Sequence, residues 1–279
     1  MAGRFRFWNF DTRVHYRSDF VEQMSATDIK NAGECDFKVY YKLLGEFKPP
    51  KSIPLVLGSI FHEVIEQDLR YKVKRGVNMK WEEVNNYFEN VWVKAKQGCA
   101  FDGKITEEQA KIKCKTYIRI YHLKMSPMLY PLDNSSIEKF FRVYITFGDK
   151  RLGITGKVDM IGKDMFITDH KTSSAVWTQK DADEEIQAQL YSYCMKNLGF
   201  EIQGFKFSVV SGVGVNVFPV EYNQAKLKEI LLKAFDIKKR LEGGQELMLR
   251  SRSERICKFC DFGRAGICKE SLFKKEEVL

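Results

Sequence analysis

The stretch Gly156–Lys171, GKVDMIGKDMFITDHK, predicts two short β-strands joined by a turn at Gly162-Lys163-Asp164, because a glycine-containing loop lies between two apolar runs. A loop of those three residues would place Asp159 opposite Ile167 and diagonal to Asp169. Side chains alternate along a strand, so both carboxylates are expected on one face of the hairpin. A register shifted by one residue would break this arrangement.

Lys171 belongs to the same face, which therefore carries two carboxylates and one ammonium group beside apolar side chains. Charged groups on an apolar face are expected to be paired or bound to a metal. Asp159 and Asp169 offer the hard oxygen ligands that Mg²⁺ and Mn²⁺ prefer. Lys171 would orient a water or offset charge during phosphodiester hydrolysis. The alternative is an edge hairpin whose charged side chains are only solvated.

The composition indicates a globular, cytoplasmic protein with an anionic partner. At 279 residues, the chain can hold one large domain with appendages or two small ones. Met1–Phe10 lacks the apolar core of a signal peptide, and no run is long enough to span a membrane. The net charge of +9 favours nucleic acid, although a generically basic protein would share it. The seven cysteines indicate thiols or a metal centre rather than disulfides.

A helical region is predicted over residues 25–130, after an N-terminal segment, 1–24, that shows no clear period. A short helix is expected there with Ser25 or Thr27 as its cap. Apolar residues three and four apart predict further helices over Gly58–Lys74, Trp81–Lys96 and Thr106–Lys124. His62 lies on the first of these, where it is a functional residue, a core histidine or a surface histidine.

Residues 131–245 are predicted to form a sheet with two helices. Strands are expected over Ile137–Thr146, Arg151–Ile161, Met165–Lys171, Gly204–Ser211 and Val215–Val220, and helices over Asp181–Leu198 and Asn223–Leu241. Gln187 and Tyr191 lie four apart and therefore on one helix face, where they would extend the site if they faced the sheet. Glu138 begins the first strand and is either a pairing residue at a rim or an accessory acid.

The C-terminal segment, 246–279, is rich in cysteine. Cys257, Cys260 and Cys268 lie within twelve residues, which core packing explains poorly. Zinc and iron–sulfur centres both accept thiolates, and both usually take four ligands. Cys35 is the candidate for the fourth ligand, because it stands between Glu34 and Asp36, an unusual place for a core thiol.

Together these residues resemble the PD-(D/E)xK nuclease superfamily and, within it, the RecB-like branch. The resemblance covers Ser25 to Lys269 and runs through His62 after Gly58, Asp159 in GKVD, Asp169-His170-Lys171 and Gln187-x-x-x-Tyr191. It implies an α/β (α+β) restriction-endonuclease-like core, a mixed central sheet flanked by helices. In that family the histidine and the two acids bind Mg²⁺ or Mn²⁺, the lysine serves the nucleophilic water, and the glutamine and tyrosine support the site or the DNA strand. The resemblance assigns these roles to His62, Asp159, Asp169, Lys171, Gln187 and Tyr191.

The cysteines are similar to those of the iron–sulfur members of that branch, namely AddB-type recombination subunits and CRISPR-associated spacer-acquisition exonucleases. This resemblance implies a [4Fe–4S] cluster that clasps the N- and C-terminal segments together and is held by Cys35, Cys257, Cys260 and Cys268. The gap between Cys260 and Cys268 is longer than the family pattern, and Gly263 and Gly266 in it indicate a looped insertion. Zinc therefore stays open as the alternative.

The resemblance implies a metal-dependent DNA exonuclease that acts on single-stranded ends, 5′→3′, in recombination, repair, replication or spacer acquisition. The alternative is a DNA-binding or assembly subunit of a larger recombination or CRISPR adaptation complex, although the intact acids, lysine and histidine argue against an inactive nuclease. A zinc-stapled protein with surface acids is a third hypothesis. The sequence leaves open the strand polarity, exonuclease against endonuclease or flap action, the oligomeric state, and a cellular or viral origin.

Overall fold

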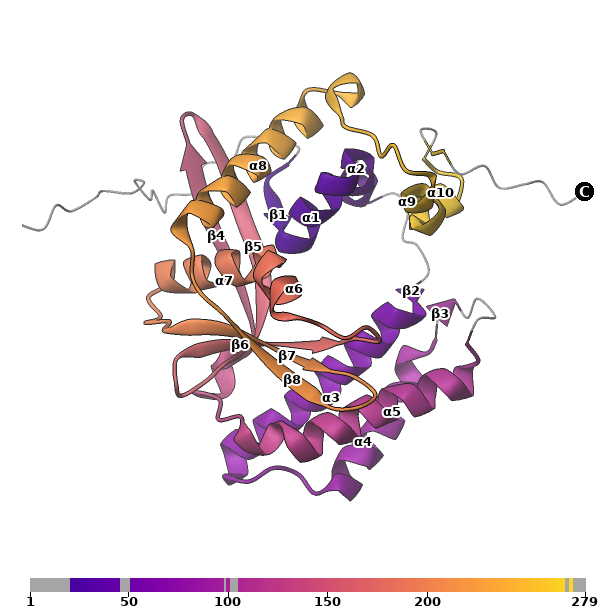
Figure 1. The fold of residues 1–279 in the computed structure, drawn as a ribbon, viewed down its shortest axis with the longest axis vertical. Helices are drawn as coiled ribbons and strands as arrows, with labels where there is room; N and C mark the ends of the chain where they lie inside the picture. The colour runs from indigo at the N-terminus through magenta and orange to yellow at the C-terminus, as the bar shows by residue number, and fades with distance from the viewer. Residues whose placement is uncertain (1–20, 46–50, 98, 101–104, 269–270, 273–279) are drawn as a thin grey trace, which may run out of the picture. The chain divides into compact units, whose positions relative to one another are not determined.

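The predicted hairpin belongs to a mixed β-sheet (Figure 1). The structure is a computed structural model, and it describes residues 21–45, 51–97, 99–100, 105–268 and 271–272. The strand order is β1-β5-β6-β7-β8, and β4 also pairs with β5. The strands are β1 (Gln23–Ser25), β4 (Ile137–Phe147), β5 (Lys150–Ile161), β6 (Phe166–Thr172), β7 (Gly204–Val210) and β8 (Val215–Val220). β1 with β5 and β6 with β7 are parallel, whereas β5 with β6 and β7 with β8 are antiparallel. The mixed sheet confirms the predicted fold class.

The chain divides into two compact units, each assembled from separate segments. The terminal unit contains the described residues within Met1–Pro49, Arg142–Gly156 and Asn223–Leu279, and the hairpin unit contains those within Pro50–Phe141 and Lys157–Tyr222. The segments predicted from the sequence, by contrast, are consecutive blocks of the chain. Residues 1–20 of the predicted N-terminal segment, and 269–270 and 273–279 of the tail, lie outside the described residues.

Three helices of the hairpin unit pack against one another, as Figure 1 shows: α3 (Ile53–Arg75), α4 (Trp81–Ala95) and α5 (Glu107–Lys124). Their core buries large apolar side chains, among them Phe61, Phe88 and Tyr121. Each fully buried side chain of this kind stabilises the fold by roughly 1.5–3 kcal/mol. The three predicted helices are confirmed, except that α3 begins five residues before Gly58, because Pro54 suits the first turn of a helix.

The smaller elements of the hairpin unit connect these parts. They are β2 (Lys51–Ser52), which pairs with β3 (Cys99–Ala100), and the short 3₁₀ helices η1 (Ser126–Met128) and η2 (Asn134–Ser136). Cys114 is buried in the helical core and Cys99 packs against it, so both thiols have a packing role. Within the described residues, no helix is long and apolar enough to cross a membrane.

The turn between β5 and β6 is longer than predicted. Ile161 pairs with Ile167 rather than with Met165, which lies in the turn with a φ of 57°. Asp164 lengthens this turn by accepting a hydrogen bond from the backbone N–H of Phe166, with a distance of 3.1 Å from N to Oδ1, as Asx turns do. The predicted register is therefore wrong by two residues, and Asp159 lies opposite Asp169 by extension of the observed pairing. An even shift keeps every side chain on its predicted face.

Two helices follow β6 where a single one, Asp181–Leu198, was predicted: α6 (Gln179–Glu184) and α7 (Ile186–Asn197). Glu185 separates them in an extended conformation, with φ −70° and ψ 120°. Thr178 caps α6, and Gln179 Nε2 donates to the carbonyl oxygen of Pro219 in β8 at 2.7 Å. We attribute the break between α6 and α7 to these two contacts, which hold α6 at its N-terminus and against β8.

The terminal unit contains the chain segments that carry the four candidate cysteine ligands. Its helices are α1 (Ala26–Glu34), α2 (Asp36–Leu44), α8 (Gln224–Glu242), α9 (Glu254–Phe259) and α10 (Asp261–Arg264), with the short η3 (Gln245–Leu247). α1 begins with a capping box between Ser25 and Asp28, which confirms Ser25 as its cap. α1 and α2 contact α8, and α9 contacts α10. Asn223 caps α8, so the predicted long helix is also confirmed.

Candidate functional site

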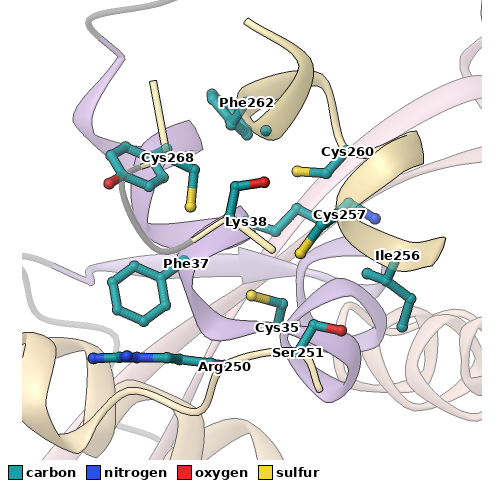
Figure 2. Close-up of a pocket in the computed structure, with 13 residues that line it drawn as sticks. Cys35, Phe37, Lys38, Arg250, Ser251, Ile256, Cys257, Cys260, Phe262 and Cys268 are labelled. Carbon is teal, nitrogen blue, oxygen red and sulfur yellow. The ribbon is translucent and has the colours of Figure 1, made fainter. Parts of the chain in front are cut away.

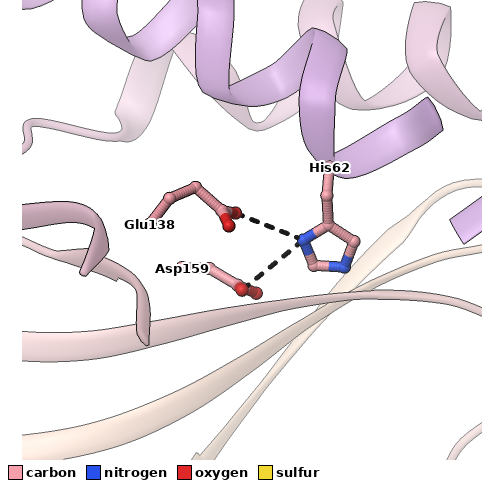
Figure 3. A group of neighbouring side chains, drawn as sticks. All are labelled: His62, Glu138 and Asp159. Atoms are coloured by element: carbon pink, nitrogen blue, oxygen red, sulfur yellow. Dashed lines mark ion pairs between the residues drawn. The ribbon is translucent and has the colours of Figure 1, made fainter. Parts of the chain in front are cut away.

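Three side chains from separate parts of the sequence meet in the hairpin unit (Figure 3): His62 from α3, Glu138 from β4 and Asp159 from β5. Nδ1 of His62 lies 3.5 Å from Oδ1 of Asp159 and 3.6 Å from Oε1 of Glu138. Across the described part of the chain, no other three histidine, cysteine or acidic side chains bring their ligand atoms within 4.8 Å of one another. One imidazole nitrogen and two carboxylates form a donor set that suits a divalent cation.

Glu138 is the member of this group whose role the sequence analysis left open. Its backbone has a φ of 52°, in the left-handed region that residues other than glycine rarely adopt and that often marks functional sites. Its side chain is 7% exposed and pairs with the ammonium group of Lys157. A glutamate at the start of a strand gives no sequence signal for this conformation, so the site could not be completed from the sequence.

The second group of the site is built from the acid-x-Lys element and the helix that follows. Nζ of Lys171 lies 2.7 Å from Oδ2 of Asp169 and donates to Oε1 of Gln187 at 2.8 Å. Nε2 of Gln187 in turn donates to Oδ1 of Asp169 at 2.6 Å. Each of the three side chains therefore fixes the other two. Gln187 faces the sheet, which is the condition under which it extends the site, and it holds both charged groups in place.

Tyr191 lies one turn after Gln187 on α7 and has a supporting position. Its side chain is buried, and its ring packs edge-on against Phe141 with 5.0 Å between ring centroids. Burial, and next the charge of Asp169, raise the pKa of Tyr191 to about 12. The phenol is therefore neutral at physiological pH and acts here through packing. All six residues of the predicted nuclease site lie in the hairpin unit.

His170 links the two groups through its backbone, although the sequence motif counts only its neighbours. Its N–H donates to Oδ2 of Asp159 at 2.7 Å, which fixes that carboxylate. Its side chain points to the other face of β6, where Nδ1 lies 2.5 Å from the hydroxyl oxygen of Tyr121 in α5. Burial, and next the charge of His62, lower the pKa of His170 to about 3. The imidazole is therefore neutral and holds the β6 backbone against α5.

The carboxylates of the site shift the pKa values of their neighbours. Burial lowers the pKa of His62, but Asp159, a hydrogen bond with Glu138, and Asp169 raise it more, to about 9. Burial raises the pKa of Asp159 to about 7; the charge of His62 opposes this shift, and Asp169 and Glu138 add to it. Burial also lowers the pKa of Lys171, but the negative charges of Asp169 and Asp159, together with the hydrogen bond to Asp169, raise it more. Closely spaced, buried carboxylates of this kind favour the binding of a cation between them.

The four candidate cysteines line one pocket of the terminal unit. Cys35 lies between α1 and α2, Cys257 in α9, Cys260 between α9 and α10, and Cys268 after α10. In Figure 2 their sulfur atoms point into the same pocket, beside Phe37. Segments about two hundred residues apart in the sequence thus bring soft thiol donors together, which zinc and iron–sulfur centres both use.

Asp36 anchors the helix next to this pocket. Its carboxylate is fully buried and accepts two hydrogen bonds from Arg240 of α8, at 2.6 Å from Nε and 3.0 Å from Nη2. The backbone N–H of Leu249 donates to the same carboxylate at 2.8 Å, and the N–H of Asp36 donates to the carbonyl oxygen of Leu249 at 2.9 Å. Cys35 is therefore held by its neighbour to the chain segment that leads to the other three cysteines.

Comparisons with known proteins agree with this architecture. The chain matches the family model of the PD-(D/E)XK nuclease superfamily over residues 23–269. A solved structure from Eubacterium rectale, of a protein provisionally named an exonuclease, has a TM-score of 0.54 at 16% identity and covers 91% of this chain and 90% of its own. The structure of SSO0001 has a TM-score of 0.37 at 15% identity and covers 88% of this chain and 96% of its own. No curated protein matches the chain significantly. The Eubacterium likeness shows the fold alone.

Proposed function

The chain belongs to the PD-(D/E)XK nuclease superfamily, and from that premise we propose that it hydrolyses DNA phosphodiester bonds with Mg²⁺ or Mn²⁺ as its cofactor. The observation that carries the proposal is the meeting of His62, Glu138 and Asp159 in the same unit as the Asp169–Lys171 pair. These are the residue types that metal-dependent phosphodiester hydrolysis requires.

The donor atoms fit a divalent cation. His62, Glu138 and Asp159 would hold it, and the buried carboxylate of Asp169 lies near enough to raise the pKa of both His62 and Asp159. When bound, such an ion polarises the scissile phosphate and lowers the pKa of a water. Carboxylates suit both Mg²⁺ and Mn²⁺, and the imidazole nitrogen favours the transition metal, Mn²⁺.

The remaining residues prepare the nucleophile. Lys171 is held by two hydrogen-bonding partners, Asp169 and Gln187, so its ammonium group has a fixed direction from which to orient a water or offset developing charge. Tyr191 supports the helix that carries Gln187. His62 carries a proton below pH 9 in the metal-free protein, and it must release that proton to become a ligand.

We propose single-stranded DNA ends as the substrate and 5′→3′ as the direction, on the resemblance to RecB-like exonucleases. The net charge of +9 and the 37 Phe, Tyr and Trp residues support a single strand, which needs a basic groove and stacking aromatics. Recombination, repair, replication and spacer acquisition all supply such ends. The second candidate function, a DNA-binding or assembly subunit of a larger complex, differs in having no cleavage of its own.

A cleavage assay on 5′- and 3′-labelled single-stranded DNA, with Mn²⁺ against EDTA, tests the activity. Lys171→Ala is the test variant, and Lys163→Ala is the control because Lys163 is an exposed lysine of the same hairpin. Metal-dependent shortening by the wild type and the control, lost in Lys171→Ala, supports the nuclease, and the order in which the labels are released gives the polarity. Binding without cleavage by the wild type would favour the assembly subunit.

We also propose a [4Fe–4S] cluster in the cysteine pocket, held by Cys35, Cys257, Cys260 and Cys268. The four thiols that line the pocket give the number of ligands that a [4Fe–4S] cluster takes, and that a structural zinc ion also takes. The resemblance to iron–sulfur nucleases supports the cluster over zinc. Iron, sulfide and zinc analysis of protein purified without oxygen tests the assignment: zinc without iron would exclude the cluster.

A further inference from the structure

Lys157 has a position in the site that the nuclease motif does not explain. It lies in β5 two residues before Asp159, so both side chains are on the same face of the strand. Its ammonium group pairs with Oε2 of Glu138. The Lys157 side chain is 56% exposed, whereas that of Glu138 is 7% exposed. The largely solvated ammonium group of Lys157 therefore pairs with the buried carboxylate of Glu138.

Glu138 is shared between this lysine and the cation site. Its Oε1 atom lies 3.6 Å from Nδ1 of His62, and its carboxylate is one of the three ligand groups of the cluster in Figure 3. A divalent cation on this carboxylate would stand next to the ammonium group, and like charges that close repel each other. Lys157 and the cation therefore compete for Glu138.

Of the two lysines in the site, Lys157 is the one free to move. Lys171 is held by Asp169 and Gln187, and its side chain is 28% exposed. Among the described residues Lys157 forms an ion pair with Glu138 alone, while the charges of Glu66 and Asp159 act on it without an ion pair, and its side chain is flexible and largely hydrated. Outward movement would place its positive charge in solvent beside the cation site.

We propose that Lys157 changes its partner when a divalent cation binds. In the metal-free protein it neutralises Glu138, and once the cation occupies that carboxylate it binds a phosphate of the DNA strand. This inference rests on the proposed nuclease function and adds a second lysine, with a different task, to Lys171. Lys171 acts at the reacting centre, whereas Lys157 contributes to binding of the strand.

The test measures Mn²⁺ affinity and DNA kinetics separately, with Lys157→Met as the variant and Lys163→Met as a charge-matched control. Calorimetric titration with Mn²⁺ alone should give tighter binding for Lys157→Met by roughly two- to fivefold, the range expected from an exposed ion pair. In Mn²⁺-dependent cleavage of single-stranded DNA, the same variant should raise KM with little change in kcat. It should also reduce the slope of log affinity against log salt by about 0.7, the loss of one phosphate contact. Lys157→Arg should restore KM.

Lys157→Met is expected to bind Mn²⁺ more tightly and DNA more weakly, and these opposite changes distinguish this role from a structural one. Weaker Mn²⁺ binding by Lys157→Met would overturn the proposal, because it would mean that Lys157 only positions Glu138 as a ligand. An unchanged KM would overturn the phosphate contact. In a Glu138→Gln background, Lys157→Met should no longer alter Mn²⁺ affinity, and a change there would show that Lys157 does not act through Glu138. A wild type without Mn²⁺-dependent cleavage would instead refute the nuclease function on which the inference rests.

Discussion

The affinity of the site for Mn²⁺ should rise steeply with pH, because His62 must lose a proton before it can bind a metal. Its pKa of about 9 means that at pH 7 only about one molecule in a hundred has the neutral imidazole. Releasing the proton at pH 7 costs up to about 2.7 kcal/mol at about 1.4 kcal/mol per pH unit. The side chain is 30% exposed, so solvent screening places the measured cost below this figure.

Titration calorimetry from pH 6 to pH 10 measures this effect. The dissociation constant of Mn²⁺ should fall about tenfold per pH unit between pH 7 and pH 9 and level off above pH 9. Below pH 7 the dependence should steepen, because the pKa of Asp159 is about 7 and its carboxyl group then carries a proton as well. His62→Gln should abolish the dependence between pH 7 and pH 9.

The unfolding free energy of the metal-free protein should change in the opposite direction. The pKa of His62 is raised in the folded state, so the stability it contributes is complete below pH 6.5 and is lost as the pH rises through 9. Urea unfolding in EDTA should therefore give a smaller free energy at pH 9 than at pH 6.5, and the same protein with Mn²⁺ should gain stability over this range. A Mn²⁺ affinity independent of pH would refute the assignment of His62 as a ligand that must lose a proton to bind the metal.

Three further substitutions test other parts of the structure. Gln187→Leu leaves Asp169 and Lys171 without the amide that holds both, and it should lower kcat by about 10- to 100-fold, the usual cost of losing such a partner, in the single-strand cleavage assay. Arg240→Met leaves the fully buried carboxylate of Asp36 without its cation and should reduce the unfolding free energy by about 3–5 kcal/mol in urea titrations; an unchanged midpoint would contradict this. Cys257→Ala should lose iron and visible absorbance and lower the melting temperature, whereas retained iron would exclude this residue as a ligand.

The shared face of Asp159 and Asp169 could be predicted because strand periodicity is unchanged by a register shift of two residues. The observed register differs by two residues, and an even shift leaves Asp159 and Asp169 on one face. Gln187 and Tyr191 keep their predicted four-residue spacing on one helix, because both lie in α7, after the break at Glu185. The turn length itself depends on a hydrogen bond that the Asp164 side chain accepts from the backbone N–H of Phe166, which no periodic pattern contains.

Glu138 marks the limit of prediction from sequence. Its approach to His62 depends on a backbone conformation with a φ of 52°, and glutamate carries no preference for that conformation. The contact also joins residues that are distant in the sequence, so local propensity gives no information about it. The cysteines differ from Glu138 in this respect, because the spacing of Cys257, Cys260 and Cys268 alone predicts a shared site.

The pairing of Asp36 with Arg240 has a consequence for the order of events during synthesis. The two residues are 204 positions apart, so at 5–20 residues per second the ribosome makes the aspartate about 10–40 seconds before its partner exists. During that time the carboxylate cannot be buried without a large penalty, and α2 cannot dock. The nascent chain must therefore keep Cys35 exposed to solvent or to a chaperone, and the terminal unit closes only after the hairpin unit has been made in full.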